Sequence, residues 1–142
     1  MILVDLNVLL YAVNRSASEH RAASSWMEAT LAEGRHTIGL AWAVILGFLR
    51  LSTSPRLFPA PLTVDTATLF VDTLLGHPAV RRVQPGQGHW PLLRHMISLS
   101  GTGGNLTTDA HLAALALEND AIVATRDADF SRFPGIRVLN PF

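Results

Sequence analysis

Short apolar runs alternate with longer amphipathic stretches along the chain. Five of the short runs are predicted to be buried strands, because they leave no room for polar alternation. They span residues 1–5, 36–39, 80–84, 121–125 and 136–139. Strands separated mostly by helices predict an α/β domain with a largely parallel sheet.

The stretches between these runs have the periodicity of helices. The predicted helices cover residues 7–13, a long segment after 16–18 that ends at about 33, 41–52, 64–75, a segment from 89 to about 100, and a last one that reaches 118. Gly34 is expected to end the second helix, and Thr107 or Thr108 to cap the last one. Residues 54–62, "SPRLFPAPL", and 101–105, "GTGGN", are predicted loops, the second of them flexible.

The composition agrees with one compact domain over residues 1–142. Hydrophobic residues make up 49% of the chain and charged residues 15%, which is typical of a folded protein rather than a disordered chain. The absence of cysteine excludes disulfides and thiolate-bound zinc and fits a cytoplasmic protein. The longest uncharged apolar run, residues 38–49, is too short for a membrane helix, and no basic leader precedes the first run. We therefore expect neither a membrane span nor a signal peptide.

The 11 acidic and 11 basic residues balance, so the net charge gives no support for non-specific affinity for nucleic acid. All the basic residues are arginines. Any mechanism that requires a lysine is therefore excluded.

Carboxylates stand at positions that an α/β sheet would bring together. Asp5 ends the first predicted strand, and Asp127 and Asp129 follow the fourth. Asp109 stands in the first turn of the helix that leads into the fourth strand. Sites in such sheets form beyond the carboxyl ends of the strands. Each aspartate also has a local interpretation as a helix cap or as a charge at a helix N-terminus, but all of these interpretations together need three independent coincidences.

Carboxylates that gather at one place repel one another, so they stay ionised only with a compensating cation. Oxygen ligands suit Mg²⁺ or Mn²⁺, which keep several waters and favour phosphate substrates. The pattern therefore indicates metal-assisted hydrolysis of a phosphodiester.

Four neighbouring residues leave alternatives open. Asn7 is expected either to hydrogen-bond the site or to begin the first helix. Thr125 is expected either to position an aspartate or bind phosphate, or to be a buried residue at a strand end. Arg126 is a candidate phosphate contact or a solvated arginine. His111 lies two residues past Asp109 and would point to a different helix face, which favours a structural role.

The two ends of the chain carry motifs in a specific order and at a specific separation. The first is "ILVDLNVLLYA", and the second is "TTDAHLAALALENDAIVATRDADFSRFPGIRVLNP" at residues 107–141. With the intervening helices, they resemble the PIN-domain family and, more narrowly, VapC-type toxins of toxin–antitoxin pairs. The resemblance implies a PIN-like three-layer fold with a five-stranded parallel sheet flanked by helices. It also implies a homodimeric endoribonuclease that depends on Mg²⁺ or Mn²⁺ and is neutralised by a VapB-type antitoxin covering the active site.

The resemblance also assigns roles to the aspartates. Asp5 matches the family's first metal-binding acid, and Asp109, in "TDAHLAAL", matches a later acid at a helix start. Asp127, in "TRDADF", matches the acid after the fourth strand, and Asp129 is a supplementary acid close by. The resemblance thus implies that Asp5, Asp109 and Asp127 hold the metal, while Asp129 supports it or activates water.

One position departs from the family's pattern. The glutamate that members usually carry on the second conserved helix is replaced by Gly47, and residues 37–64 contain no acid. Glu28 and Glu33 are possible substitutes or simply solvated charges on the preceding helix. The alternative function is therefore a catalytically weakened PIN-fold module that binds RNA or protein.

A second enzyme class is suggested by "VDLNV", which is similar to the start of haloacid-dehalogenase-like phosphatases. Those enzymes need an aspartate where this chain has Asn7, and a lysine that this chain lacks. The sequence therefore argues against this class.

Overall fold

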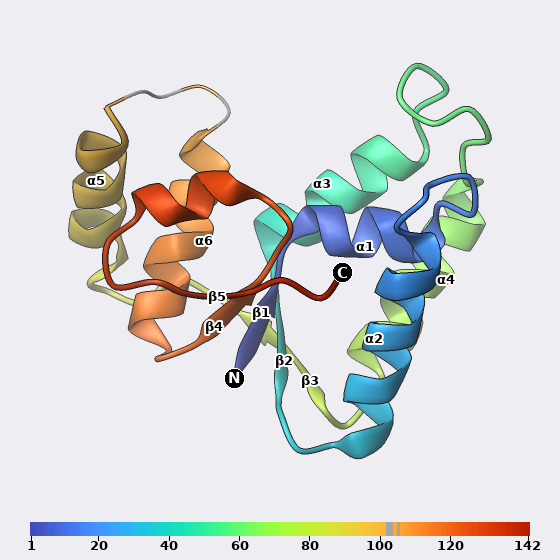
Figure 1. The fold of residues 1–142 in the computed structure, drawn as a ribbon, viewed down its shortest axis with the longest axis horizontal. Coiled ribbons are helices and arrows are strands. Elements are labelled where there is room, and N and C mark those ends of the chain that lie inside the picture. The colour runs from blue at the N-terminus through green and yellow to red at the C-terminus, as the bar shows by residue number, and fades with distance from the viewer. Residues whose placement is uncertain (102–103, 105) are drawn as a thin grey trace.

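One sheet lies at the centre of the described part of the molecule, with five parallel strands in the order β3-β2-β1-β4-β5 (Figure 1). The computed structural model describes residues 1–101, 104 and 106–142. The strands are β1 (Ile2–Val4), β2 (Ile38–Ala41), β3 (Val80–Val83), β4 (Ile122–Ala124) and β5 (Arg137–Leu139). β1 occupies the middle of the sheet, between β2 and β4.

Helices cover both faces of this sheet. They are α1 (Leu6–Val13), α2 (His20–Glu33), α3 (Trp42–Ser52), α4 (Val64–Leu75), α5 (His89–Ser100) and α6 (Leu106–Glu118), and a 3₁₀ helix, η1 (Ala128–Arg132), follows β4. Figure 1 shows α5 and α6 on one side of the sheet and α1, α2 and α4 on the other. The predicted three-layer α/β fold with a five-stranded parallel sheet is confirmed.

The core explains why the strands are uninterrupted apolar runs. Leu3 and Val4 of β1, and Val123 and Ala124 of β4, have no exposed surface. A parallel strand that is covered by helices on both faces has no solvated side on which polar residues would alternate. β3, at the edge of the sheet, has two exposed arginines, Arg81 and Arg82. The apolar run 38–49 divides into β2 and the start of α3, and none of the described helices is long and apolar enough to cross a membrane.

Most predicted element boundaries agree with the structure within two residues. The predicted strand at 36–39 lies instead at Ile38–Ala41, because pairing with β1 begins at Ile38 while His36 stays exposed. Gly34 ends α2 in the left-handed conformation, with φ of 60°, as predicted. Residues 54–62 form the expected loop.

The prediction that Thr107 or Thr108 caps the last long helix is wrong. α6 begins at Leu106, whose side chain is buried, so both threonines lie inside its first turn and are exposed. The residue that precedes Leu106, and residues 102 and 103 of the predicted flexible loop, lie outside the described residues.

Candidate active site

Asp5 ends the central strand with only 8% of the residue exposed. It is the N-cap of α1, and its Oδ1 accepts a hydrogen bond from the backbone N–H of Leu6 at 2.6 Å. Its Oδ2 accepts two more, from Asn7 Nδ2 at 2.7 Å and from the Thr125 hydroxyl at 2.6 Å. Burial raises the pKa of Asp5 above its ordinary value, the bonds from Thr125 and Leu6 oppose that rise, and the charge of Asp127 adds to it.

Thr125 joins the two ends of the chain at this site. It directly follows β4, the neighbour of β1 in the sheet, and is 1% exposed. Its hydroxyl donates to Asp5 and accepts from Asn7 Nδ2 and from the backbone N–H of Asp127, both at 2.9 Å. A hydroxyl has one donor and two acceptor positions, so this one is fully used. Both sequence interpretations of Thr125 hold, because it is a buried strand-end threonine that also positions an aspartate.

The loop after β4 carries the next two aspartates. Asp127 is exposed and caps η1, because its Oδ1 accepts a hydrogen bond from the Asp129 backbone N–H at 2.8 Å. Asp129 is partly exposed and forms an ion pair with Arg132 at 3.0 Å. The capping interpretation is therefore correct for both Asp5 and Asp127, but it does not exclude a second role, since each retains oxygen lone pairs.

Asp109 lies in the first turn of α6 and is partly buried. Its pKa is raised from 3.8 to about 6, first by desolvation and then by the negative charges of three other carboxylates: Asp5, Asp127 and Asp129. Repulsion from all three shows that the fold brings the four predicted aspartates, from three distant segments, into one electrostatic field.

A cleft of about 610 Å³ opens beside these carboxylates. Its lining includes three of the aspartates and a wall from α3; the lining residues are Asp5, Leu6, Ala43, Leu46, Gly47, Arg50, Leu51, Gly104, Thr108, Asp109 and Asp127. A smaller adjoining hollow of about 210 Å³ is lined by the same three aspartates together with Leu6, Asn7 and Leu10. Asp129 lines neither, and its influence on Asp109 is electrostatic.

Within residues 1–101, 104 and 106–142, no three His, Cys, Asp or Glu side chains are already grouped closely enough to form a complete metal-binding set. The chemistry of the site nevertheless fits a hard cation, because three carboxylates line the cleft and the buried Asp5 already has a fixed orientation. Mg²⁺ usually binds through one or two carboxylates and keeps several waters, so it does not require an all-protein cage.

Gly47, the position that the resemblance matches to a glutamate of the family, lies in the wall of the cleft and has no side chain. A Cβ built on Gly47 would lie 2.8 Å from Leu6 Cδ2, so the Leu6 side chain fills the space that a larger residue at position 47 would need. The possible substitutes are not at the cleft: Glu28 is exposed on α2, and Glu33 is exposed and pairs with Arg35.

The remaining candidates have structural partners. Asn7 both lies in the first turn of α1 and hydrogen-bonds the site, as described above. Arg126 forms an ion pair with Glu19, a residue that the sequence did not single out. His111 Nδ1 lies 2.8 Å from Nε2 of the buried His89 in the interface between α5 and α6, which confirms its structural role.

The sequence also missed the α3 wall as part of the site. Arg50 and Leu46 line the cleft, and the available signal was that Arg50 is the single charged residue in an otherwise apolar helix.

Comparison with protein families decides the identity of this fold. The model of the PIN domain matches residues 2–136. The chain belongs to the PIN domain family. Within this PIN domain family it is 43% identical to Ribonuclease VapC37 of Mycobacterium tuberculosis over 141 residues, covering 99% of this chain and 97% of the relative. It is 38% identical to Ribonuclease VapC33 of the same species, with coverage of 99% and 98%.

Solved structures share this PIN-domain fold at low sequence identity. The VapBC2 structure from Rickettsia felis, bound to a DNA fragment from the promoter, has a TM-score of 0.70 at 18% identity and covers 99% of this chain and 98% of the other. The DNA-bound VapBC structure from Salmonella typhimurium has a TM-score of 0.70 at 14% identity, with the same coverage. At these identities the likeness shows the fold alone.

The Thr125 hydroxyl network makes a prediction about stability. Thr125→Val removes the donor to the buried Asp5 and two acceptor positions, and we expect it to lower the free energy of unfolding by about 1–3 kcal/mol. Thr125→Ser keeps the hydroxyl and serves as the matched control. Urea denaturation measures both, and equal losses for the two variants would mean that packing of the methyl group, not the hydroxyl, is what matters.

The raised pKa of Asp109 makes a prediction about pH. Because folding raises this pKa from 3.8 to about 6, the folded protein binds the proton more tightly than the unfolded chain between those values. The stability of the metal-free protein therefore falls as the pH rises through this window. We expect Asp109→Asn to flatten that fall and to raise the melting temperature at pH 7, measured in EDTA. Asp72→Asn, an exposed change on α4, is the control, and an identical pH profile for both variants would contradict the prediction.

Proposed function

We propose that this protein is a metal-dependent endoribonuclease, the toxin of a VapBC-type toxin–antitoxin pair, which hydrolyses RNA phosphodiester bonds. The observation that carries the proposal is the convergence of Asp5, Asp109 and Asp127 on one open cleft. Relatives that are named ribonucleases, with 37–43% identity over nearly the whole chain, support the same activity.

In this proposal Asp5, Asp109 and Asp127 are the ligands of Mg²⁺ or Mn²⁺. Their carboxylates face the cleft and comprise only oxygen donors, the type that these cations prefer. The raised pKa of Asp109 agrees with this assignment, because after desolvation by burial its causes are the negative charges of the neighbouring carboxylates, which a cation would offset. When bound, the cation would lower the pKa of a water and stabilise charge on the phosphate and the leaving oxygen.

The surrounding residues hold this arrangement in place. The three donors on Asp5 fix its carboxylate so that a lone pair of Oδ1 stays available, since only the Leu6 N–H occupies that oxygen. Thr125 sets the position of Asp127 through the backbone N–H of that residue. Asp129, next to the cluster, would support the cation or accept a proton from the attacking water.

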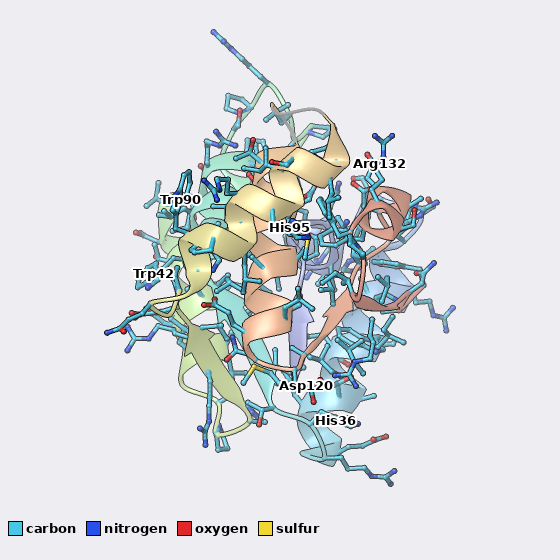
Figure 2. All side chains as sticks on the ribbon, turned by 90° about the vertical axis from the view of Figure 1, so that its left-hand side faces the viewer. His36, Trp42, Trp90, His95, Asp120 and Arg132 are labelled. Atoms are coloured by element: carbon cyan, nitrogen blue, oxygen red, sulfur yellow. The ribbon has the colours of Figure 1, made fainter. Side chains whose placement is uncertain are left out.

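We further propose that the chain acts in the cytoplasm, as a homodimer, against an RNA substrate, and that a VapB-type antitoxin neutralises it. Exposed tryptophans support an interface between subunits, because Trp42 is 44% exposed and Trp90 is 65% exposed. Figure 2 shows both side chains at the same edge of the molecule. The VapBC complexes that share the fold support an antitoxin partner for this chain.

Asp127→Asn tests the proposed activity most cleanly. The asparagine Oδ1 can still accept the hydrogen bond that caps η1, so the variant removes the charge and keeps the local structure. We expect RNA cleavage with Mg²⁺ to fall at least about a hundredfold, because a metal ligand supplies several kcal/mol of transition-state stabilisation. Calorimetric titration with Mn²⁺ should show weaker binding, and Asp72→Asn should change neither measurement.

Undiminished cleavage by Asp127→Asn would overturn the metal assignment. A wild-type protein that binds no Mn²⁺ at millimolar concentration and cleaves no RNA would overturn the proposed activity itself.

A second candidate function is a PIN-fold module that binds RNA or protein with little catalysis. Gly47 favours it, because the α3 wall of the cleft offers no carboxylate. The two candidate functions differ in whether the aspartates support RNA cleavage without an acid on α3.

Adding a glutamate at position 47 distinguishes them. Since the new Cβ would lie 2.8 Å from Leu6 Cδ2, Gly47→Glu is combined with Leu6→Ala, and Leu6→Ala alone is the control. Under the leading proposal the wild type cleaves RNA, and we expect the double variant to change its rate by less than about threefold. The measurement is the initial rate of RNA cleavage with Mg²⁺. A rate for the double variant about a hundredfold above that of a nearly inactive wild type would instead identify a degraded site.

A further inference from the structure

The α3 wall of the cleft carries one charge, and that charge is positive. Arg50 is the only charged residue between Trp42 and Ser52, and the neighbouring residues on the wall are apolar or glycine. Its side chain lines the cleft together with Asp5, Asp109 and Asp127, and it is exposed to solvent. A cation therefore stands in this wall, about one turn after Gly47.

Among the described residues, no acidic side chain forms an ion pair with Arg50. The two arginines that lie close to Asp127 and Asp129 in the sequence do have acidic partners. Arg126 pairs with Glu19, and Arg132 pairs with Asp129. The charges that raise the pKa of Asp109 are those of Asp5, Asp127 and Asp129. Arg50 thus lines the cleft without an ion pair to its carboxylates, which leaves the guanidinium available to a ligand.

The geometry points to Arg50 as a residue that binds a phosphate of the RNA substrate, next to the phosphodiester at the aspartates. This inference rests on the proposed function and adds a substrate contact to it. A guanidinium presents a planar fork of N–H donors that matches two phosphate oxygens, and such charge-assisted pairs are among the stronger hydrogen bonds. RNA must bring its negative backbone up to a cluster of carboxylates, so a cation on the facing wall offsets part of that repulsion.

A purely structural role for Arg50 makes different predictions. Arg50 lies in the last turn of α3, where a cation interacts favourably with the helix dipole. That role would affect thermal stability but not the affinity for RNA or its dependence on salt.

The test compares Arg50→Gln, Arg50→Lys and Arg35→Gln in the full-length protein. Arg35 is exposed and lies before the amino end of β2, at the end of the sheet opposite the cleft. Arg35→Gln therefore changes the net charge by the same amount as Arg50→Gln but leaves the cleft intact. The probe is a fluorescently labelled single-stranded oligoribonucleotide of mixed sequence, and its binding is measured by anisotropy in EDTA over a range of salt concentrations. Cleavage rates with Mg²⁺ and melting temperatures are measured on the same samples.

We expect Arg50→Gln to weaken RNA binding about tenfold and to reduce the slope of log Kd against log salt by about 0.7, the value for one phosphate contact on a single strand. Arg50→Lys keeps the charge but not the fork, so it should restore the slope while binding about threefold more weakly than the wild type. Arg35→Gln should match the wild type in both respects.

The outcomes separate this inference from the function on which it rests. A wild-type protein that neither binds nor cleaves RNA overturns the proposed function, and the role of Arg50 with it. A wild-type protein that cleaves RNA, with Arg50→Gln equal to Arg35→Gln in affinity and slope, overturns the role of Arg50 alone. A lower melting temperature for Arg50→Gln with unchanged affinity and slope also overturns it, because Arg50 would then act only on α3.

Discussion

The carboxylate of Asp5 is buried at the end of the central strand, and three hydrogen-bond donors hold it there. A buried carboxylate without partners is strongly disfavoured, so these donors are a condition for having an acid at this position at all. They come from α1, which Asp5 itself caps, and from Thr125 after β4. The pairing of β1 with β4 therefore does more than build the sheet, because it also places the hydroxyl that makes the buried acid tolerable.

Much of the fold was predictable from local pattern, because buried parallel strands and amphipathic helices differ in length and periodicity. The predicted bounds of α4 agree with the structure to the residue, where Thr63 caps its start and Gly76 follows its end. The exact place of β2 was not predictable, because register with β1 and β3 fixes it and neither contact is visible locally. The start of α6 was missed for a similar reason: burial of Leu106 extends the helix beyond its threonines.

The candidate site was predictable where topology alone determines it. The carboxyl ends of parallel strands share one edge of a sheet, so the acids that follow β1 and β4 were expected at the same edge, and the pairing of β1 with β4 makes them neighbours there. The α3 wall was not predictable, because it depends on which face of a nearly all-apolar helix turns toward the cleft. Sequence reasoning therefore identified the acidic side of the cleft and overlooked the side that carries Arg50. The close approach of the Leu6 side chain to Gly47 likewise depends on packing between α1 and α3.

The order of the strands has a consequence for synthesis of the protein. Thr125, which follows β1's partner β4, lies 120 residues after Asp5 along the chain. A nascent polypeptide that has not reached Thr125 on the ribosome lacks both Asp127 and one of the three donors to Asp5. Assembly of the acidic cleft therefore waits until residues 122–127 have been made.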